Sequence, residues 1–148
     1  MKKLLLYFLL TLPLVFVACG DDDEGDDVTI VAKWKCTSME IDVDGKVPED
    51  VAALKEELTL QMNEAFAGKI HNFRNDGIYV DPKGNENRYA LQNYTLTIYD
   101  GDVLLWKFSV VSLTTMSVKL RIDWTEQKKI ETAEEITKCV IDLNFSKQ

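Results

Sequence analysis

The sequence is poor in the residues that most often carry chemistry, with one histidine and three cysteines among its 148 residues. It contains no His-Glu-x-x-His, Cys-x-x-Cys or Gly-x-Ser-x-Gly pattern, so the familiar zinc-peptidase, thiol-redox and serine-hydrolase sites are excluded. The single histidine, His71, falls in a predicted strand, where we expect a partly exposed structural residue. We therefore expect a protein that is not an enzyme, with no catalytic centre, metal site or cofactor.

Positive charge is also scarce, because 17 lysines and arginines face 25 acidic residues and form no basic stripe. Nucleic-acid-binding surfaces need clustered cations, so we expect no nucleic-acid partner. The tetrapeptide "DVDG" at Asp42 contains part of a calcium-loop pattern. The later ligand positions fall on Lys46 and on a predicted helix, which excludes a calcium loop of that type.

No hydrophobic run is long enough to span a membrane. The longest, residues 4–17, is shorter than the ~20 residues that cross a bilayer, and Pro13 interrupts it. Two lysines precede this run, and the small residue Ala18 follows it directly before Cys19. This layout is typical of a secretory signal, so we predict that residues 1–18 are a signal peptide.

The end of the run, "FVAC", resembles the lipobox of bacterial lipoproteins, in which the cysteine is lipidated and becomes the first residue of the mature chain. Phe16 stands where this motif usually has leucine. The resemblance implies lipidation of Cys19 and a membrane partner held through acyl chains, which anchor a protein without a spanning helix. An ordinary secretory signal with an incidental cysteine is the alternative.

Residues 20–27, "GDDDEGDD", contain six acids, two glycines and nothing apolar. Such a segment cannot bury surface and favours an extended linker, so we predict that residues 19–27 are a lipidated acidic tether. Acidic residues after a lipidated cysteine also resemble the surface-export signal of some Gram-negative lipoproteins, with a plain spacer as the alternative. We expect an outer-membrane lipid anchor, facing the periplasm or the cell surface.

Residues 28–148 are predicted to form one domain, with a net charge of −4 and enough residues for a single core. Its only cysteines, Cys36 and Cys139, lie near the two ends of the domain. Because export implies an oxidising compartment, we predict a disulfide between them if the first and last strands are neighbours. Two buried thiols are the alternative.

Alternating apolar and polar residues predict most of the domain as strands with one buried face, most clearly at residues 116–124. The other predicted strands are residues 30–43, 70–73, 78–80, 89–91, 94–99, 103–111 and 137–145. Residues 48–67 instead have apolar side chains at helical spacing, with Pro48 suited to the first turn and Gly68 to the end.

One strand, one helix and then about seven strands with short connections favour an antiparallel up-and-down arrangement. Closing such a sheet removes its exposed edges. We therefore predict a mainly β protein, an antiparallel barrel of about eight strands with one amphipathic helix between the first two strands. We expect that helix to cover one mouth of the barrel and no second helix to form. A two-sheet sandwich is the alternative.

Several stretches, in order and spacing, resemble the lipocalin-like domains of small bacterial lipoproteins: "WKCTS" from Trp34, "PEDVAALKEEL", "FRNDGIY", "YTLTIYDGD" and "FSVVSLTTMSVKL". The resemblance implies a lipocalin-like barrel that binds small hydrophobic molecules, with Trp34 plugging its closed end. Lipocalins proper carry Gly-x-Trp in the first strand and an arginine in the last strand. Here Ala32 occupies the glycine position and residues 137–145 contain no arginine.

Five aromatic side chains are predicted to point inward and to line any cavity: Trp34, Tyr94, Trp106, Phe108 and Trp124. An eight-stranded barrel encloses only its own side chains or one small ligand, so a filled core and a cavity both stay open. We expect a membrane-anchored lipoprotein that binds a small hydrophobic ligand. The alternative is a structural or accessory lipoprotein with a filled core, which docks a partner protein through Val103, Leu105 and Val140.

Overall fold

The computed structural model describes residues 28–148. The predicted signal peptide (1–18) and the tether with its lipidation site Cys19 (19–27) lie outside the described residues. These two segments stay predictions.

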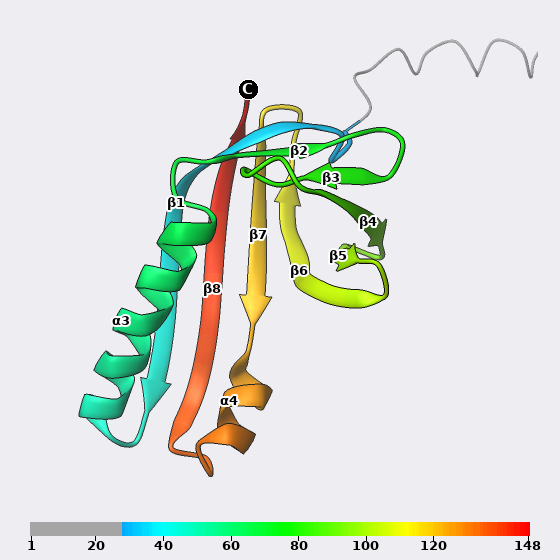
Figure 1. Cartoon of the computed structure of the whole chain (residues 1–148). Helices are drawn as coiled ribbons and strands as arrows, with labels where there is room; N and C mark the ends of the chain where they lie inside the picture. The colour runs from blue at the N-terminus through cyan, green and yellow to red at the C-terminus, as the bar shows by residue number, and fades with distance from the viewer. Residues whose placement is uncertain (1–27) are drawn as a thin grey trace, which may run out of the picture.

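Eight antiparallel strands form a closed barrel in chain order, as predicted, so the sandwich alternative is wrong (Figure 1). The strands are β1 (Ala32–Gly45), β2 (Ile70–Phe73), β3 (Ile78–Val80), β4 (Glu86–Gln92), β5 (Thr95–Asp100), β6 (Val103–Leu113), β7 (Ser117–Asp123) and β8 (Ile136–Lys147). Helix α3 (Pro48–Ala65) connects β1 to β2, and the short helix α4 (Thr125–Glu131) connects β7 to β8.

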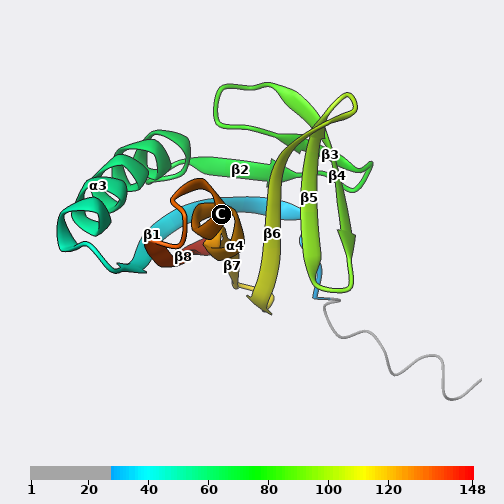
Figure 2. The same cartoon turned by 90° about the horizontal axis from the view of Figure 1, so that it is seen from below.

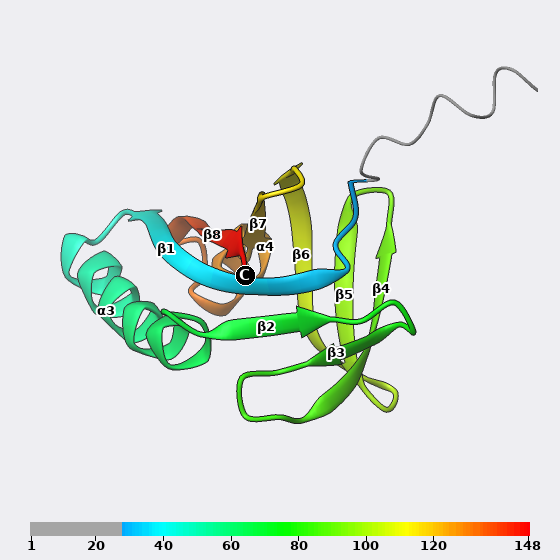
Figure 3. The same cartoon turned by 90° about the horizontal axis from the view of Figure 1, so that it is seen from above.

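The barrel closes through the first and last strands, which pair along almost their full lengths. Trp34 lies opposite Lys147 at one end of this ladder and Gly45 lies opposite Ile136 at the other. The pairing of β1 with β2 covers only Ala32–Lys35. Strands β1 and β8 therefore extend well beyond the shorter strands, which gather at one end of the molecule (Figures 1 and 3).

A β-bulge in β1 changes which residues face inward. Trp34 and Cys36 are buried, the register shifts between Cys36 and Ser38, and Val43 is the next buried residue of the strand. A bulge places two residues opposite one, so the apolar positions move from even to odd numbers. The alternation in residues 30–43 therefore has one break that the predicted single strand did not include.

The predicted disulfide is wrong, because the structure holds Cys36 and Cys139 as two buried free thiols. Their strands are neighbours, as the prediction required, but Cys36 lies opposite Phe145 and Cys139 lies opposite Val43. Six residues of extended chain separate the two positions, which is roughly 20 Å at about 3.3 Å per residue. A disulfide needs Cα atoms within about 7 Å.

Helix α3 begins at Pro48, which occupies the first turn as predicted, and buries Leu58 and Met62 in the core. It packs beside the part of β1 that β2 leaves uncovered, along the extended end of the barrel (Figures 1 and 3). The buried residue Phe66 follows the helix as its C-cap, and Gly68 then adopts a left-handed φ of 68°.

Helix α4 corrects the expectation that no second helix forms. It buries none of its own side chains in the core, so it lacks the apolar stripe from which a helix is predicted. Local polar contacts stabilise it instead: the Asp123 carboxylate accepts from the backbone N–H of Thr125 at 2.9 Å, and Lys128 pairs with Glu131 at 2.8 Å. Helix α4 packs against β8, and the view from below shows it near the centre of the molecule with α3 at the left (Figure 2).

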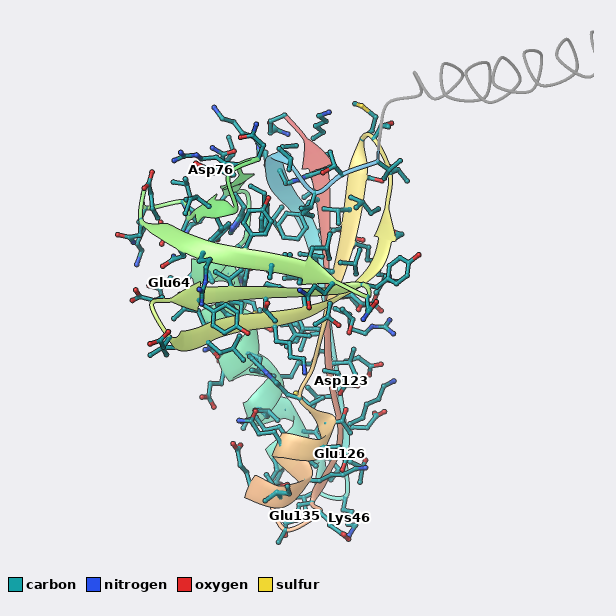
Figure 4. The ribbon with its side chains drawn as sticks, turned by 90° about the vertical axis from the view of Figure 1, so that its right-hand side faces the viewer. Lys46, Glu64, Asp76, Asp123, Glu126 and Glu135 are labelled. Atoms are coloured by element: carbon teal, nitrogen blue, oxygen red, sulfur yellow. The ribbon has the colours of Figure 1, made fainter. Side chains whose placement is uncertain are left out.

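The connection after β1 passes very close to the connection before β8. The backbone N–H of Lys46 donates to the carbonyl oxygen of Glu135 at 2.8 Å, and both residues lie at the same tip of the molecule (Figure 4). A Cβ atom added to Gly45 would lie 2.5 Å from that same carbonyl oxygen and 3.0 Å from Cγ2 of Val51. Glycine is therefore required where β1 meets β8.

We expect Gly45→Ala to destabilise the domain by about 1–3 kcal/mol, because the added methyl group forces two backbone segments apart. Urea unfolding followed by circular dichroism measures the change. Substitution of its exposed neighbour, Asp44→Ala, is the control and should change stability by less than about 0.5 kcal/mol. Equal stability of Gly45→Ala and the control would contradict the close approach.

Candidate functional site

The interior of the barrel is filled by side chains. A small space inside the barrel has a volume of about 10 Å³ and is lined mainly by aromatic and aliphatic groups, including Trp34, Phe66 and Phe108. A space of this size holds one water molecule at most. Of the two alternatives left open by the sequence, the structure has the filled core.

The aromatic residues predicted to line a cavity do not share one environment. Trp34 and Phe108 line the small interior space, as predicted. The indole of Trp34 is 1% exposed, and its Nε1–H donates to the carbonyl oxygen of Ile30 at 2.8 Å. Trp106 is half-buried and lines the mouth of the barrel instead. Trp124 is half-buried against the core beside α4 and lines neither space.

The prediction for Tyr94 is wrong, because 79% of this residue is exposed. Asn93 and Tyr94 have φ values of 50° and 60° and connect Gln92 to Thr95, which are a cross-strand pair. Two central residues with positive φ are typical of a tight two-residue hairpin turn. The strand therefore starts one residue later than the alternation suggested, and the Tyr94 ring lies outside the barrel.

The mouth of the barrel holds a larger cavity, with a volume of about 360 Å³, between the end of α3, the β3–β4 connection and β6. Its lining mixes rings and charges. Phe66 and Trp106 contribute apolar surface, and Glu64, Lys69, Asp81 and Lys83 contribute two negative and two positive charges. Glu64 lies on the last turns of α3, at the side of the barrel where the strands gather (Figure 4).

His71 and Tyr79 line both the mouth and the interior space. His71 was expected to be partly exposed, but it is only 3% exposed, because it lies opposite the inward-pointing Trp34 in the β1–β2 pair. Its Nδ1 lies 2.7 Å from the hydroxyl oxygen of Tyr79. Burial lowers the pKa of His71 to about 4, so the imidazole is neutral at pH 7.

The contact with Tyr79 indicates which ring nitrogen of His71 carries the proton. Burial raises the pKa of Tyr79, so its hydroxyl keeps its proton. If that hydroxyl donates to Nδ1, the imidazole proton sits on Nε2 and only Nε2–H stays unpaired. The opposite tautomer would leave the hydroxyl proton unpaired as well, so the first arrangement is favoured.

Nε2 of His71 is buried and has no hydrogen-bond partner within residues 28–148. A buried donor without an acceptor costs about 1–3 kcal/mol, and native proteins contain few of them. The predominantly apolar lining of the small interior space gives a water molecule few partners there. The arrangement therefore has one unused donor at the boundary between the mouth and the interior.

Phe66 forms that boundary. Its ring stacks on His71, with centroids 5.2 Å apart and planes 22° apart. It also meets Trp106 at 5.0 Å, Phe108 at 6.1 Å and Phe145 at 6.5 Å, each in an edge-to-face arrangement. We refer to these four partner rings as the aromatic box. The Phe66 ring fills the box and separates the two spaces.

Two of the charged side chains at the rim of the mouth, Asp81 and Lys69, already make hydrogen bonds within the protein. The Asp81 carboxylate accepts from the backbone N–H groups of Lys83 and Asn85 and from the Asn85 side chain, each at 2.8 Å. Burial opposes ionisation of Asp81, but these hydrogen bonds outweigh it and lower its pKa. The Lys69 ammonium donates to the backbone carbonyl of Glu64.

A second charged cluster lies on the outer face of β7 and β8. The Asp142 carboxylate accepts two hydrogen bonds from Arg121, at 2.7 and 2.9 Å, and pairs with Lys119 at 3.2 Å. Its groups satisfy one another, which indicates a structural role. Among residues 28–148, no group of three or more histidine, cysteine and acidic side chains could hold a metal ion.

Neither helix within residues 28–148 combines the length and the apolar character needed to cross a membrane. Comparison of the chain with protein-family models, with curated proteins and with solved structures finds no match. The resemblance to lipocalin-like lipoproteins therefore stays a prediction.

We expect the free energy of unfolding to decrease as the pH is lowered, because His71 must stay neutral in the folded state. Its pKa is about 4 in the folded protein, against an ordinary value of 6.5, so between these values only the unfolded chain binds the proton. The contribution is complete above pH 6.5 and is lost as the pH falls towards 4, by about 3 kcal/mol in total.

Urea unfolding at pH values from about 7 to about 4.5 measures this loss. His71→Phe, which cannot titrate, is the comparison and should show a smaller decrease over the same range. Carboxylates with lowered pKa values, such as Asp123 and Asp142, contribute to both proteins alike. Identical pH dependence of the two proteins would contradict a buried neutral imidazole.

Proposed function

We propose that this protein is a lipid-anchored lipocalin-like binding protein of the bacterial outer membrane, not an enzyme, and that it takes a small ligand at the mouth of its barrel. The observation that carries this proposal is the cavity of about 360 Å³ directly outside the neutral His71, with aromatic rings at its base. The interior space of about 10 Å³ is too small for any such ligand.

The composition of the mouth supports binding of a small molecule. Ligand sites typically combine apolar surface with a few polar groups that fix orientation, in volumes of about 300–1,000 Å³. Here Phe66 and Trp106 supply the apolar surface, and Lys69 and Lys83 supply donors at the rim. His71 and Tyr79 line the base of the mouth, so polar groups stand at both depths of the site.

The N-terminal sequence supports the lipid anchor. A positive start, a short apolar run and "FVAC" precede an acidic tether. The first described residues, Val28 and Thr29, are exposed, and Ile30 is the first buried residue. The described domain therefore begins at its own surface, in a position compatible with a tether that leads to a membrane. The anchored domain would face either the periplasm or the cell surface.

We expect Cys19→Ala to abolish incorporation of radiolabelled fatty acid and to move the protein from the membrane fraction to the soluble fraction. The reason is that acyl chains on this cysteine would hold the mature protein at the membrane. Asp21→Ala, which alters the tether but keeps "FVAC" intact, is the control and should stay labelled. A Cys19→Ala protein that keeps its label would contradict lipidation at this residue.

We expect at least one compound in a panel of fatty acids, sterols, haems and small aromatic molecules to raise the melting temperature of the protein. A ligand at 100 times its Kd stabilises the folded state by about 2.7 kcal/mol. Binding should also change tryptophan fluorescence through Trp106, so Trp106→Phe should lose that change. Trp124→Phe is the matched control, because Trp124 does not line the mouth. A panel without any thermal shift would contradict the proposed binding function.

A second candidate function is docking of a partner protein, which a filled core permits. Val103, Leu104 and Leu105 follow one another on β6 with exposures of 64%, 47% and 43%. Adjacent exposed apolar residues are typical of an interaction surface, whereas Val140 is half-buried. For this function Leu105→Asp should abolish recovery of one reproducible partner after cross-linking in cells, and unchanged recovery would exclude that surface.

A further inference from the structure

We propose that the end of the barrel at which the described chain begins docks on a lipid bilayer with anionic headgroups, and that this contact turns the mouth away from the membrane. The docking surface, here called the entry face, consists of exposed apolar and basic residues from separate segments: Val28, Lys33, Lys35, Tyr94, Met116 and Lys147. The inference rests on the lipid anchor of the proposed function and adds a second contact with the same membrane, made by the folded domain.

The segments of the entry face meet at one end of the barrel. The backbone N–H of Lys147 donates to the carbonyl oxygen of Met116, and the N–H of Gln148 donates to that of Lys33, both at 2.9 Å. Tyr94 lies in the β4–β5 hairpin. Figures 2 and 3 show this hairpin and the β6–β7 connection beside the start of the described chain. Residues far apart in the sequence therefore form one surface around the point where the chain enters the domain.

The apolar side chains of the entry face suit the boundary between lipid and water. Tyr94 is 79% exposed, Met116 65% and Val28 53%. A tyrosine combines an apolar ring with a polar hydroxyl, and this residue type is enriched where a bilayer meets water. The exposed apolar residues at the start of β6 differ in their surroundings, because they directly follow the acidic turn of residues 100–102.

Acidic residues are absent from the segments that meet at the entry face. Four segments together contain seven lysines and arginines and no aspartate or glutamate: residues 28–39, 87–99, 107–122 and 143–148. All 19 acidic residues of the domain lie elsewhere in the sequence. Figure 4 shows Asp123, Glu126 and Glu135 towards the opposite tip of the molecule. The domain is therefore polarised, with its positive charge gathered at the end where the chain enters.

The lysines of the entry face are available to an anionic partner. Lys119 and Arg121 pair with Asp142, but Lys33, Lys35 and Lys147 form no ion pair within residues 28–148. One lysine close to an anionic membrane surface strengthens binding by about fivefold. Because the domain has a net charge of −4, such a surface attracts it only when the basic end faces the lipid.

The chain that precedes the domain favours a bilayer as the occupant. If Cys19 is lipidated, nine residues, 19–27, separate the acyl chains from Val28, which is at most roughly 30 Å at about 3.3 Å per residue. Attachment beside the entry face raises its effective concentration at the membrane, so a weak contact suffices. The tether itself is a poor occupant, because residues 20–27 contain no apolar side chain that would cover Tyr94 or Met116.

Docking through the entry face leaves the mouth open to water. The β3–β4 connection, which lines the mouth, lies on the side of the barrel opposite the start of the described chain (Figure 3). Glu64, which also lines the mouth, lies on that opposite side as well (Figure 4). A ligand of the mouth would therefore arrive from the aqueous phase and not from the bilayer.

The experiment holds the predicted mature chain, residues 19–148, on vesicles through an N-terminal histidine tag and a nickel-chelating lipid, so it does not depend on lipidation of Cys19. Met116→Trp places an indole on the entry face, and brominated lipids quench an indole that touches the bilayer. Ile130→Trp is the matched control, because Ile130 is 82% exposed on α4 at the opposite tip (Figure 1). We expect quenching of Met116→Trp alone, stronger with phosphatidylglycerol than with phosphatidylcholine.

Substitution of lysines tests the charge of the entry face. Lys33→Gln combined with Lys147→Gln should lower the ratio of docked to undocked molecules by roughly 25-fold on phosphatidylglycerol vesicles, because each lysine contributes about fivefold. Lys46→Gln combined with Lys55→Gln changes the net charge equally at exposed positions away from the entry face and should leave the quenching unchanged. Equal losses in the two double variants would overturn the role of the entry face.

The remaining outcomes separate this inference from the function on which it rests. Equal quenching of Met116→Trp and Ile130→Trp would show that the domain has no preferred orientation, and an unquenched Met116→Trp would overturn docking. If the tether covers the entry face instead, Met116→Trp would stay unquenched and its emission would change when the six acids of residues 20–27 are replaced by serine. Quenching of Met116→Trp in a protein whose Cys19 takes up no fatty acid would overturn the anchor alone.

Discussion

The pairing of β1 with β8 is the constraint on which the rest of the structure depends. It joins the two ends of the domain, and it leaves one edge of β1 uncovered beyond Lys35, where α3 packs. The end of α3 is then tied back to the same strand through the hydrogen bonds of Cys36 with Gly68 and Lys69. Those bonds hold Phe66 over the barrel interior, so the closure of the sheet also determines where the mouth ends.

Much of the fold could be predicted because its main signals are periodic. Strict alternation predicts strands, helical spacing predicts α3, and short connections predict antiparallel neighbours. The misses are local departures from periodicity. The bulge after Cys36 reverses the alternation, the positive φ values at Asn93 and Tyr94 shorten a strand, and α4 has no apolar stripe. Such features depend on single residues, and a periodic pattern does not reveal them.

The site was harder to predict than the fold, because alternation shows which way a side chain points but not what fills the centre. His71 and Phe73 share one face of β2, so the burial of His71 could have been found from that strand alone. Its partner Tyr79 comes from β3, and the register that joins them is not visible in the sequence. Phe66 comes from outside every strand, and an aromatic residue just before a helix-ending glycine was its only signal.

Because the barrel is filled and its mouth ends at the Phe66 ring, the affinity of any ligand that enters deeper is limited. If the Phe66 ring leaves the box in about 1% of molecules, the apparent affinity of any guest is weaker than its intrinsic affinity by about a hundredfold, or roughly 2.7 kcal/mol. Aromatic contacts alone do not recover this, because Phe66 already makes them. A ligand of the mouth therefore gains most from the surface that Phe66 leaves open, which is lined by Trp106 and by the charged side chains of the rim.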